Sequence, residues 1–349
     1  MNDHGIGDDI MAMPVIESLV SSGKEVTVFC KDFTHSIWIS LGCNVYPSWH
    51  SKGTVEYGYG TIEGSAFIGS NYTGVREVFE LKNRYEVIYT LNSWSTWESY
   101  EIGECKRTPQ QLLADLLDVQ LPETFDYIKY LRPSYSTEEY VVFAPESVNR
   151  FRRISNEKKK YKALVKEYGN VKLLGKAEID ISGKYLVHFA KGLKSKFIKA
   201  KFNLHNAWLR FSYKEFDSHK TICKTFEELV SLIYNAKLIV TADNGIMNIA
   251  RALGKPVVAE FGFSSAKFLA GQYEKYNDSP YKTIQGTYKG CSICNGKSYR
   301  GFEKDICLGK YDRPKCMGSI TVDELLNNTK ELQWQQHIMA TQVRTNQVA

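Results

Sequence analysis

Residues 238–258 read LIVTADNGIMNIARALGKPVV, and the fold prediction starts from this stretch. An apolar strand over 238–242 enters an Asp-Asn-Gly turn, a helix follows over 246–253, and another apolar strand covers 256–261. A second glycine turn opens a helix near the start of the chain, where residues 5–14 read GIGDDIMAMP. Helix N-termini bind anions through unpaired N–H groups and partial positive charge. The two turns therefore predict two α/β domains facing each other across a ligand that carries phosphate.

The same alternation of strands and helices continues on both sides of the Asp-Asn-Gly turn. We predict further strands at 25–30, 45–47, 85–91, 140–144 and 171–175, and further helices at 13–22, 33–41, 109–117, 155–168 and 226–235. Pro109 suits a first helical turn, and Ser155 suits an N-cap. Short apolar strands between helices indicate parallel sheets, so each domain is expected to be doubly wound, with ligand at the carboxyl ends of the strands in the cleft.

A polar stretch broken by proline, residues 132–139, marks the predicted domain boundary. The first domain then covers 1–135 and the second covers 136–328, followed by a C-terminal helix or tail over 329–349. The second domain contains two unusual segments, a basic insertion at 184–214 and a cysteine-rich loop at 291–316.

The composition is that of a soluble globular protein. The chain has 349 residues, of which 43% are hydrophobic and 24% are charged, with a formal net charge of +6. No run approaches the ~18 apolar residues that span a bilayer, and the polar N-terminus does not resemble a signal peptide. We therefore expect a cytoplasmic protein. Its mild positive charge permits contact with acidic partners without requiring it.

The N-terminal turn lacks the strand that should precede it. A buried strand of about five residues is expected before such a turn, but only Met1, Asn2, Asp3 and His4 precede Gly5. We interpret this as a chain that starts at an internal methionine, with reduced stability in its N-terminal half.

These two turns also carry a family resemblance. Residues 5–14 and 236–258, with Phe261-Gly262 and the cysteine stretch, resemble the signatures of the heptosyltransferase-type glycosyltransferases, glycosyltransferase family 9. The resemblance implies a GT-B fold: two Rossmann-like domains facing across a cleft, the second holding a nucleotide-sugar donor. It also implies an inverting sugar transfer to a glycan or glycolipid hydroxyl, as in lipopolysaccharide biosynthesis, with no cofactor or metal required for catalysis.

By position, Asp8 matches the family's catalytic carboxylate. The resemblance implies that Asp8 is a general base, which takes the proton of the acceptor hydroxyl as that oxygen attacks the anomeric carbon. Gly5 and Gly7 would let the acceptor approach closely. The alternative is that Asp8 only caps its helix, and Asp9 is expected to be a first-turn helix acid.

Asp243, Asn244 and Gly245 match the family's donor-binding turn. Backbone N–H groups at the start of the following helix could stabilise the charge that develops on the leaving diphosphate. Asp243 would then contact a sugar hydroxyl, and Glu227 or Glu228 the ribose. The alternative is a strand-to-helix turn closed by an Asx cap.

Three further positions are assigned to the donor by the resemblance. Asn248 stands where the family usually has histidine, so it can donate to phosphate but carries no charge. A basic residue is expected after the first strand of the second domain; Arg150, Arg152 and Arg153 lie there, and Arg153 is the closest match. The alternative is a solvated basic turn. Ser264 takes the place of a small hydroxyl residue near the donor.

Four of the eight cysteines crowd into the loop 291–316, namely Cys291, Cys294, Cys307 and Cys316. Four thiolates with one CxxC pair could form a closed tetrahedral zinc site of structural type. Two alternatives stay open: reduced cysteines that pack the loop, and disulfides, which a cytoplasmic protein disfavours.

The insertion 184–214 contains no acidic residue and interleaves lysine and arginine with aromatic residues. Two stretches of period-two alternation predict a β-hairpin with one apolar and one basic face. It could be a solvated edge hairpin. It could instead contact an anionic acceptor, either a phosphorylated glycolipid at the inner face of the membrane or nucleic acid.

The leading hypothesis is therefore a glycosyltransferase that binds a nucleotide-sugar donor and a glycan or glycolipid acceptor. One alternative keeps the fold and transfers sugar to modified nucleic acid, which salt-dependent DNA binding would favour. Another is a non-catalytic protein that binds nucleotide-sugar or glycan, as the missing first strand and Asn248 would suggest.

Overall fold

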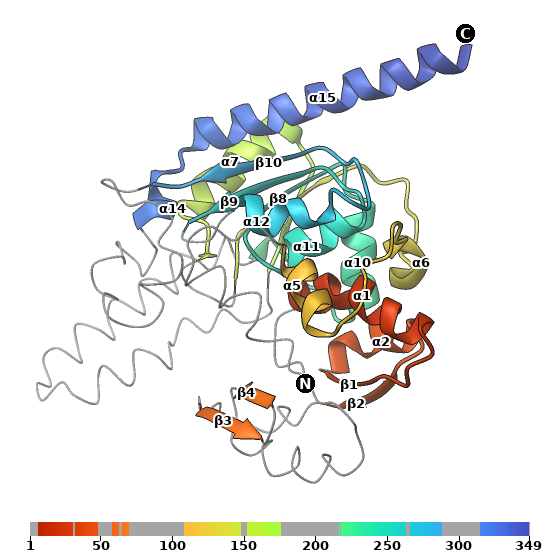
Figure 1. Ribbon diagram of the computed structural model, residues 1–349. Coiled ribbons are helices and arrows are strands. Elements are labelled where there is room, and N and C mark those ends of the chain that lie inside the picture. Colours follow the sequence, from red (N-terminus) through yellow and green to blue (C-terminus); the bar gives the residue numbers. More distant parts are fainter. Residues whose placement is uncertain are drawn as a thin grey trace, which may run out of the picture.

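The computed structural model of the chain describes ten stretches (Figure 1). They are residues 6–30, 32–47, 58–62, 65–69, 108–147, 152–175, 216, 218–262, 266–287 and 315–348. The predicted strand at 85–91, the insertion 184–214 and most of the cysteine-rich loop lie outside these residues.

A six-stranded parallel sheet forms the centre of the second half of the chain. Its strands are β5 (Val141–Ala144), β6 (Val171–Leu174), β7 (Lys220–Thr221), β8 (Leu238–Ala242), β9 (Val257–Phe261) and β10 (Tyr281–Gln285). They lie in the order β10-β9-β8-β5-β6-β7, and every neighbouring pair is parallel. This is the 3-2-1-4-5-6 order of dinucleotide-binding sheets, which bind ligands where the order reverses. That reversal falls between β5 and β8.

Both faces of this sheet are covered, as its unbroken apolar strands predict. In β8, Val240 packs in one buried cluster with Leu164 and Leu325, while its neighbour Ile239 packs in the other with Ile233 and other residues. Strand residues alternate between faces in this way because the side-chain period of a strand is two.

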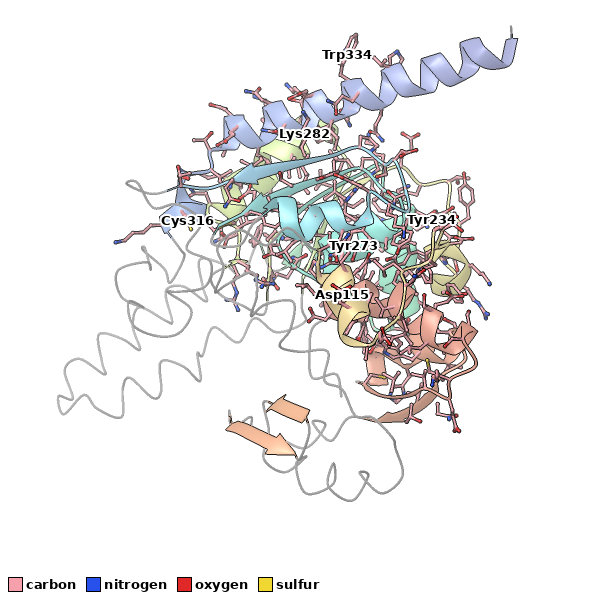
Figure 2. All side chains as sticks on the ribbon, in the orientation of Figure 1. Asp115, Tyr234, Tyr273, Lys282, Cys316 and Trp334 are labelled. Carbon is pink, nitrogen blue, oxygen red and sulfur yellow. The ribbon has the colours of Figure 1, made fainter. Side chains whose placement is uncertain are left out.

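Helices α7 (Glu157–Tyr168) and α15 (Val322–Val348) cover one face of the sheet. Figure 2 shows Lys282 on the sheet side of α15 and Trp334 on its outer side. Helices α10 (Phe226–Tyr234) and α11 (Gly245–Ala252) pack on the other face. The short helices α12 (Ala266–Ala270), η4 (Gly271–Tyr273) and α14 (Lys315–Ser319) complete this half.

The N-terminal half begins with α1 (Ile6–Ser21), β1 (Thr27–Cys30), η1 (Asp32–Thr34), α2 (His35–Ser40) and β2 (Asn44–Pro47). Strands β1 and β2 are parallel, whereas β3 (Gly58–Ile62) and β4 (Ser65–Gly69) form a separate antiparallel pair. Helices α5 (Pro109–Leu116) and α6 (Tyr127–Leu131) follow. Thr108 and Gln111 form a reciprocal capping box at the start of α5, with Pro109 in the predicted first turn.

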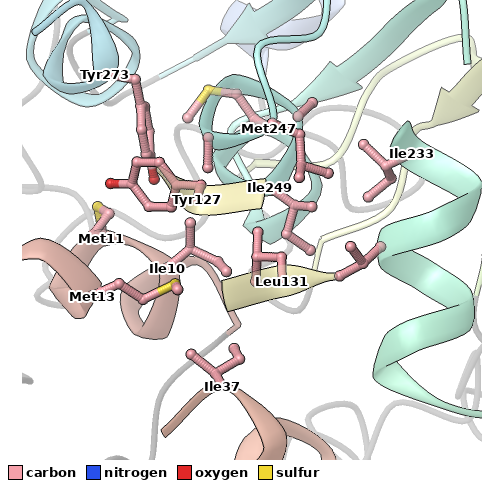
Figure 3. Packing of buried hydrophobic residues seen from close by; sticks show 14 of the residues in the cluster. Ile10, Met11, Met13, Ile37, Tyr127, Leu131, Ile233, Met247, Ile249 and Tyr273 are labelled. Carbon is pink, nitrogen blue, oxygen red and sulfur yellow. The ribbon is translucent and has the colours of Figure 1, made fainter. Parts of the chain in front are cut away.

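The first helix joins the two halves of the chain. It packs against α11, and its buried residues share one core with the α11 face of the sheet. Figure 3 shows Ile10 and Met13 of α1 close to Tyr127, Leu131, Met247 and Ile249. Each such buried side chain contributes about 1.5–3 kcal/mol of hydrophobic free energy. The first turn of α1 is therefore held firmly against the second half.

Three local predictions were wrong. Helix α1 begins at Ile6 rather than Met13, because Asp8 and Asp9 suit a first helical turn. The helix continues through Pro14. Ser155 is not an N-cap: α7 begins at Glu157, and Asn156, with a φ of 55°, takes the cap position. The helical tail begins at Val322, seven residues before 329.

The predicted boundary segment 132–139 runs along the end of α10. The Ser134 N–H donates to Ser231 Oγ at 2.9 Å, and the Ser136 N–H donates to Asn235 Oδ1 at 2.7 Å. The segment is thus fastened to the second half, while the position of the boundary itself stays a prediction.

Candidate functional site

The Asn244 side chain closes the turn between β8 and α11. Its Oδ1 accepts the N–H groups of Ile246 at 2.9 Å and Met247 at 3.2 Å, which caps α11. Its Nδ2 donates to the carbonyl of Glu146 at 2.8 Å, which ties the turn to the end of β5. The Asx cap, the alternative raised from the sequence, is therefore present. Two of the N–H groups expected to face the diphosphate are used by this cap.

Asp243 and Arg152 form an ion pair at the point where the strand order reverses. Arg152 Nε lies 3.2 Å from Asp243 Oδ2; the side chain of Asp243 is 4% exposed and that of Arg152 is 26% exposed. Arg153, the predicted basic residue, instead donates from Nε to the carbonyl of Ser147 at 2.9 Å. The structure therefore places Arg152 at the Asp243 turn.

A second ion pair lies at the same edge of the sheet. Lys220 Nζ, at the start of β7, is 2.6 Å from Glu146 Oε1, just beyond β5. Residues after β5 and β8, with the first residue of β7, therefore bring two cations and two carboxylates together in two ion pairs. Of the two cations, Lys220 is 4% exposed and Arg152 is 26% exposed, so Arg152 is the more accessible to a ligand.

Asn248 is buried, and its carboxamide makes three hydrogen bonds within the protein. Its Nδ2 donates to the carbonyl of Asn244 at 3.2 Å. Its Oδ1 accepts from Tyr273 Oη at 2.9 Å and from Gln272 Nε2 at 3.3 Å. Burial raises the pKa of Tyr273 well above its ordinary value, and the charge of Asp8 raises it further, although Arg251 opposes both effects. The Tyr273 hydroxyl therefore stays protonated and donates to Asn248.

The two glycine turns, which were predicted to face each other across a ligand, are in direct contact. A Cβ added to Gly245 would lie 3.1 Å from the backbone N of Gly7, and one added to Gly7 would lie 2.6 Å from Asn248 Nδ2. Both positions therefore need glycine for the close approach of α1 and α11. Asp8 follows Gly7 in the first turn of α1 and is half-buried, whereas Asp9 is buried. The acid at position 8 thus lies beside the donor turn.

The remaining predicted residues are placed as follows. Glu228 Oε2 accepts the N–H of Lys224 at 2.6 Å, and a hydrogen bond from Ser36 of α2 lowers the pKa of Glu227. Cys316 is half-buried near Gly262, beyond the carboxyl end of β9. Gly5, Ser264, Arg150, Cys291, Cys294 and Cys307 lie outside the described residues.

Sequence reasoning missed the role of Arg152 in the Asp243 ion pair, and it missed Tyr273 entirely. Three arginines in four positions give no signal for which one turns toward β8, since that depends on the loop backbone. Tyr273 lies in a helical turn after α12, and only the folded chain brings it to Asn248.

Several solved structures share the fold of this chain. The ADP-heptose lipopolysaccharide heptosyltransferase II of E. coli matches with a TM-score of 0.50 and 17% identity over 96% of this chain and 98% of that one. A family 9 glycosyltransferase of Veillonella parvula matches with a TM-score of 0.50 and 13% identity over 94% of both chains. The iron-containing, dodecameric glycosyltransferase TibC of enterotoxigenic E. coli matches with a TM-score of 0.51 and 14% identity over 95% of this chain and 75% of that one. The predicted α/β fold of GT-B type is confirmed.

A family model matches part of the sequence. Residues 220–297 match the model of glycosyltransferase family 9 (heptosyltransferase), which confirms the resemblance in the segment that holds the Asp243 turn. This match indicates a heptosyltransferase-like glycosyltransferase, and hence a transferase enzyme. No curated protein sequence matches the chain.

Within the described residues, no helix is both long enough and apolar enough to cross a membrane. The same residues contain no group of three or more His, Cys, Asp or Glu side chains arranged to hold a metal ion.

Proposed function

We propose that the protein transfers a sugar, with inversion, from a nucleotide-sugar donor to a hydroxyl of a glycan or glycolipid acceptor. The observation that carries the proposal is the meeting of the two glycine turns, with Asp8 on one side and the Arg152–Asp243 pair on the other. ADP-heptose is the donor we favour, because the E. coli relative of the same fold is an ADP-heptose heptosyltransferase. The acceptor we favour is lipopolysaccharide-like, because that relative acts in lipopolysaccharide synthesis.

In the proposed reaction, Asp8 takes the proton of the acceptor hydroxyl while that oxygen attacks the anomeric carbon and the bond to the diphosphate breaks. A general base of this kind contributes about 10²–10⁴-fold to the rate. The diphosphate leaves with increased negative charge. Arg152 lies where it could compensate that charge, since its side chain is 26% exposed beside Asp243.

Asp243 contributes in two ways under this proposal. Its carboxylate orients Arg152, with which it is paired. Its backbone N–H donates to the carbonyl of Glu260 in β9 at 3.2 Å, which fixes the turn relative to the sheet. Asn244 then acts as the cap that holds the turn and not as a ligand of the donor.

Turnover with ADP-heptose and heptose-deficient lipopolysaccharide core tests the proposal, with ADP release as the readout. We expect Asp8→Asn to reduce turnover by at least about a hundredfold and to leave ADP affinity unchanged. ADP binding without turnover in the wild type would favour a non-catalytic binding protein. Full turnover in Asp8→Asn would remove Asp8 from the mechanism.

We also propose that Cys291, Cys294, Cys307 and Cys316 hold a structural metal. Four thiolates suit zinc, while the iron-containing relative TibC raises iron as the alternative. Cys316 lies near Gly262, so such a site would brace the loop beyond β9. Metal analysis of the purified protein tests this: one equivalent of metal is expected, and it should be lost in Cys316→Ser.

The acceptor contact is proposed for the basic segment 184–214, at the inner face of the membrane in the cytoplasm. Charge reversal of Lys199, Lys201 and Arg210 should weaken binding of the anionic acceptor and spare ADP binding. Unchanged turnover on lipopolysaccharide core would count against this role, and salt-dependent DNA binding would point to nucleic acid instead.

A further inference from the structure

Asn248 connects the two glycine turns through its carboxamide. The residue is 7% exposed and lies in the first turns of α11. On one side its Nδ2 donates to the carbonyl of Asn244, the residue that caps the donor turn. On the other side the backbone of Gly7 rests on it, since a Cβ at Gly7 would meet Asn248 Nδ2 at 2.6 Å.

The hydrogen bonds of the Asn248 oxygen leave no acceptor capacity for a ligand. A carboxamide oxygen has two lone pairs. Tyr273 Oη and Gln272 Nε2 both donate to it, at 2.9 Å and 3.3 Å. Tyr273 is fully buried and Gln272 is 3% exposed. The orientation of the Asn248 carboxamide is therefore fixed by two buried residues of η4.

That orientation bears directly on Asp8. Gly7 and Asp8 are consecutive residues in the first turn of α1, so a shift of the carboxamide that displaces Gly7 also displaces the Asp8 carboxylate. Displacement of a reacting group by about 1 Å can cost about a hundredfold in rate.

We propose that Asn248, clamped by Tyr273 and Gln272, is a positioning residue that sets the distance between the Asp8 carboxylate and the donor turn. The proposal rests on the function proposed above, in which Asp8 is the base.

The test compares two tyrosine variants. Tyr273→Phe removes a hydroxyl that donates to Asn248, while Tyr276→Phe removes a hydroxyl without a hydrogen-bond partner among the described residues. Both rings belong to one aromatic cluster, with Tyr127 at 5.8 Å from Tyr273 and 6.0 Å from Tyr276. Steady-state kinetics use ADP-heptose and lipopolysaccharide core, and calorimetry measures ADP binding to each folded variant.

For Tyr273→Phe we expect kcat to fall about ten- to a hundredfold, while the Kd for ADP stays within about twofold. Tyr276→Phe should match the wild type in both. An unchanged kcat in Tyr273→Phe, or a Kd for ADP that rises as much as kcat falls, would overturn the proposal. If Tyr273→Phe does not fold, Gln272→Met removes the second donor to Asn248 and is judged by the same criteria.

A double-mutant cycle tests the contact with Gly7. Gly7→Ala should lower kcat by crowding Asn248, and Asn248→Ala should relieve part of that loss, so the two changes should be non-additive. Additive effects would contradict the proposal. Asp8→Asn separates the two proposals: if it retains turnover, Asp8 is not the base and the positioning role fails with it, whereas absence of turnover in the wild type would contradict the proposed function. If it is inactive while Tyr273→Phe is fully active, only the positioning role is wrong.

Discussion

Two ion pairs tie the α7 region to neighbouring strands, and they differ in their exposure to water. Lys160 Nζ lies 2.8 Å from both carboxylate oxygens of Glu260 in β9, and both side chains are fully buried. Arg152 pairs with Asp243 at 3.2 Å with about a quarter of its side chain exposed, 26%. The Lys160–Glu260 pair therefore stabilises the fold from within the core, whereas the Arg152–Asp243 pair leaves part of an arginine side chain accessible to a ligand.

The largest effect is expected from breaking the buried pair. Lys160→Met leaves the Glu260 carboxyl buried without its cation, which should lower the free energy of unfolding by about 3–5 kcal/mol. Denaturant unfolding measures this change. Lys282→Met removes a lysine that is 26% exposed and pairs with Glu331, which is 56% exposed, and should cost less than about 1 kcal/mol. Equal losses in the two variants would mean that burial does not distinguish these pairs.

The buried pair should also give the protein a pH dependence. Burial raises the pKa of Glu260 from 4.5 to about 7, although the charge of Lys160 lowers it. A pKa raised in the folded state contributes stability that is fully present below about pH 4.5 and is lost as the pH rises through about 7. The melting temperature of Lys160→Met should therefore fall between about pH 5 and pH 8. The double variant Lys160→Met/Glu260→Gln should lack this fall; its persistence would assign the titration to another group.

Breaking the partly exposed Arg152–Asp243 pair should lower the free energy of unfolding less than breaking the buried pair. Arg152→Ala should lower the free energy of unfolding by about 1–2 kcal/mol, because Asp243 is left largely buried but water reaches the arginine side of the pair. Unfolding in urea compares it with Lys160→Met. If Arg152→Ala lowers the free energy of unfolding as much as Lys160→Met does, the main role of Arg152 is to stabilise the fold.

The smallest effect is expected at the turn that carries Asp243. Asn244→Ala removes the N-cap of α11, which should cost about 1 kcal/mol. Asn244→Asp keeps the oxygen acceptor but loses the Nδ2 bond to the Glu146 carbonyl, so it should recover part of that loss. If Asn244→Ala is as stable as the wild type but loses ADP binding, Asn244 is a ligand rather than a cap.

The sheet was predictable because its signals are local. Strands such as β5 and β8 are unbroken apolar runs, and α5 begins with a proline and a capping box. Gly7 and Gly245 were both predicted to lie at helix-opening turns, but their direct contact was not predicted. The residue types at the site were also predictable, since Asp8 and Asp243 lie within the family's motifs.

The sequence did not predict which side chains form hydrogen bonds or ion pairs with one another at the site. Arg152 and Arg153 are neighbours with the same charge, and only the loop after β5 decides that Arg152 meets Asp243. Asn248 was assigned to the donor because its position in the motif is donor-binding, yet its hydrogen bonds come from Tyr273 and Gln272, which are distant in sequence. Tertiary contacts of this kind leave no periodic signal.

Calorimetric titration of ADP into the wild type, Arg152→Ala and Lys282→Ala tests the central claim most directly. Both variants lose one positive charge, but Lys282 lies at the start of β10 and pairs with Glu331 of α15. If the β5–β8 edge holds the donor diphosphate, ADP affinity should fall about ten- to a hundredfold in Arg152→Ala and stay unchanged in Lys282→Ala. Equal affinity in all three proteins would contradict the claim and place the donor elsewhere.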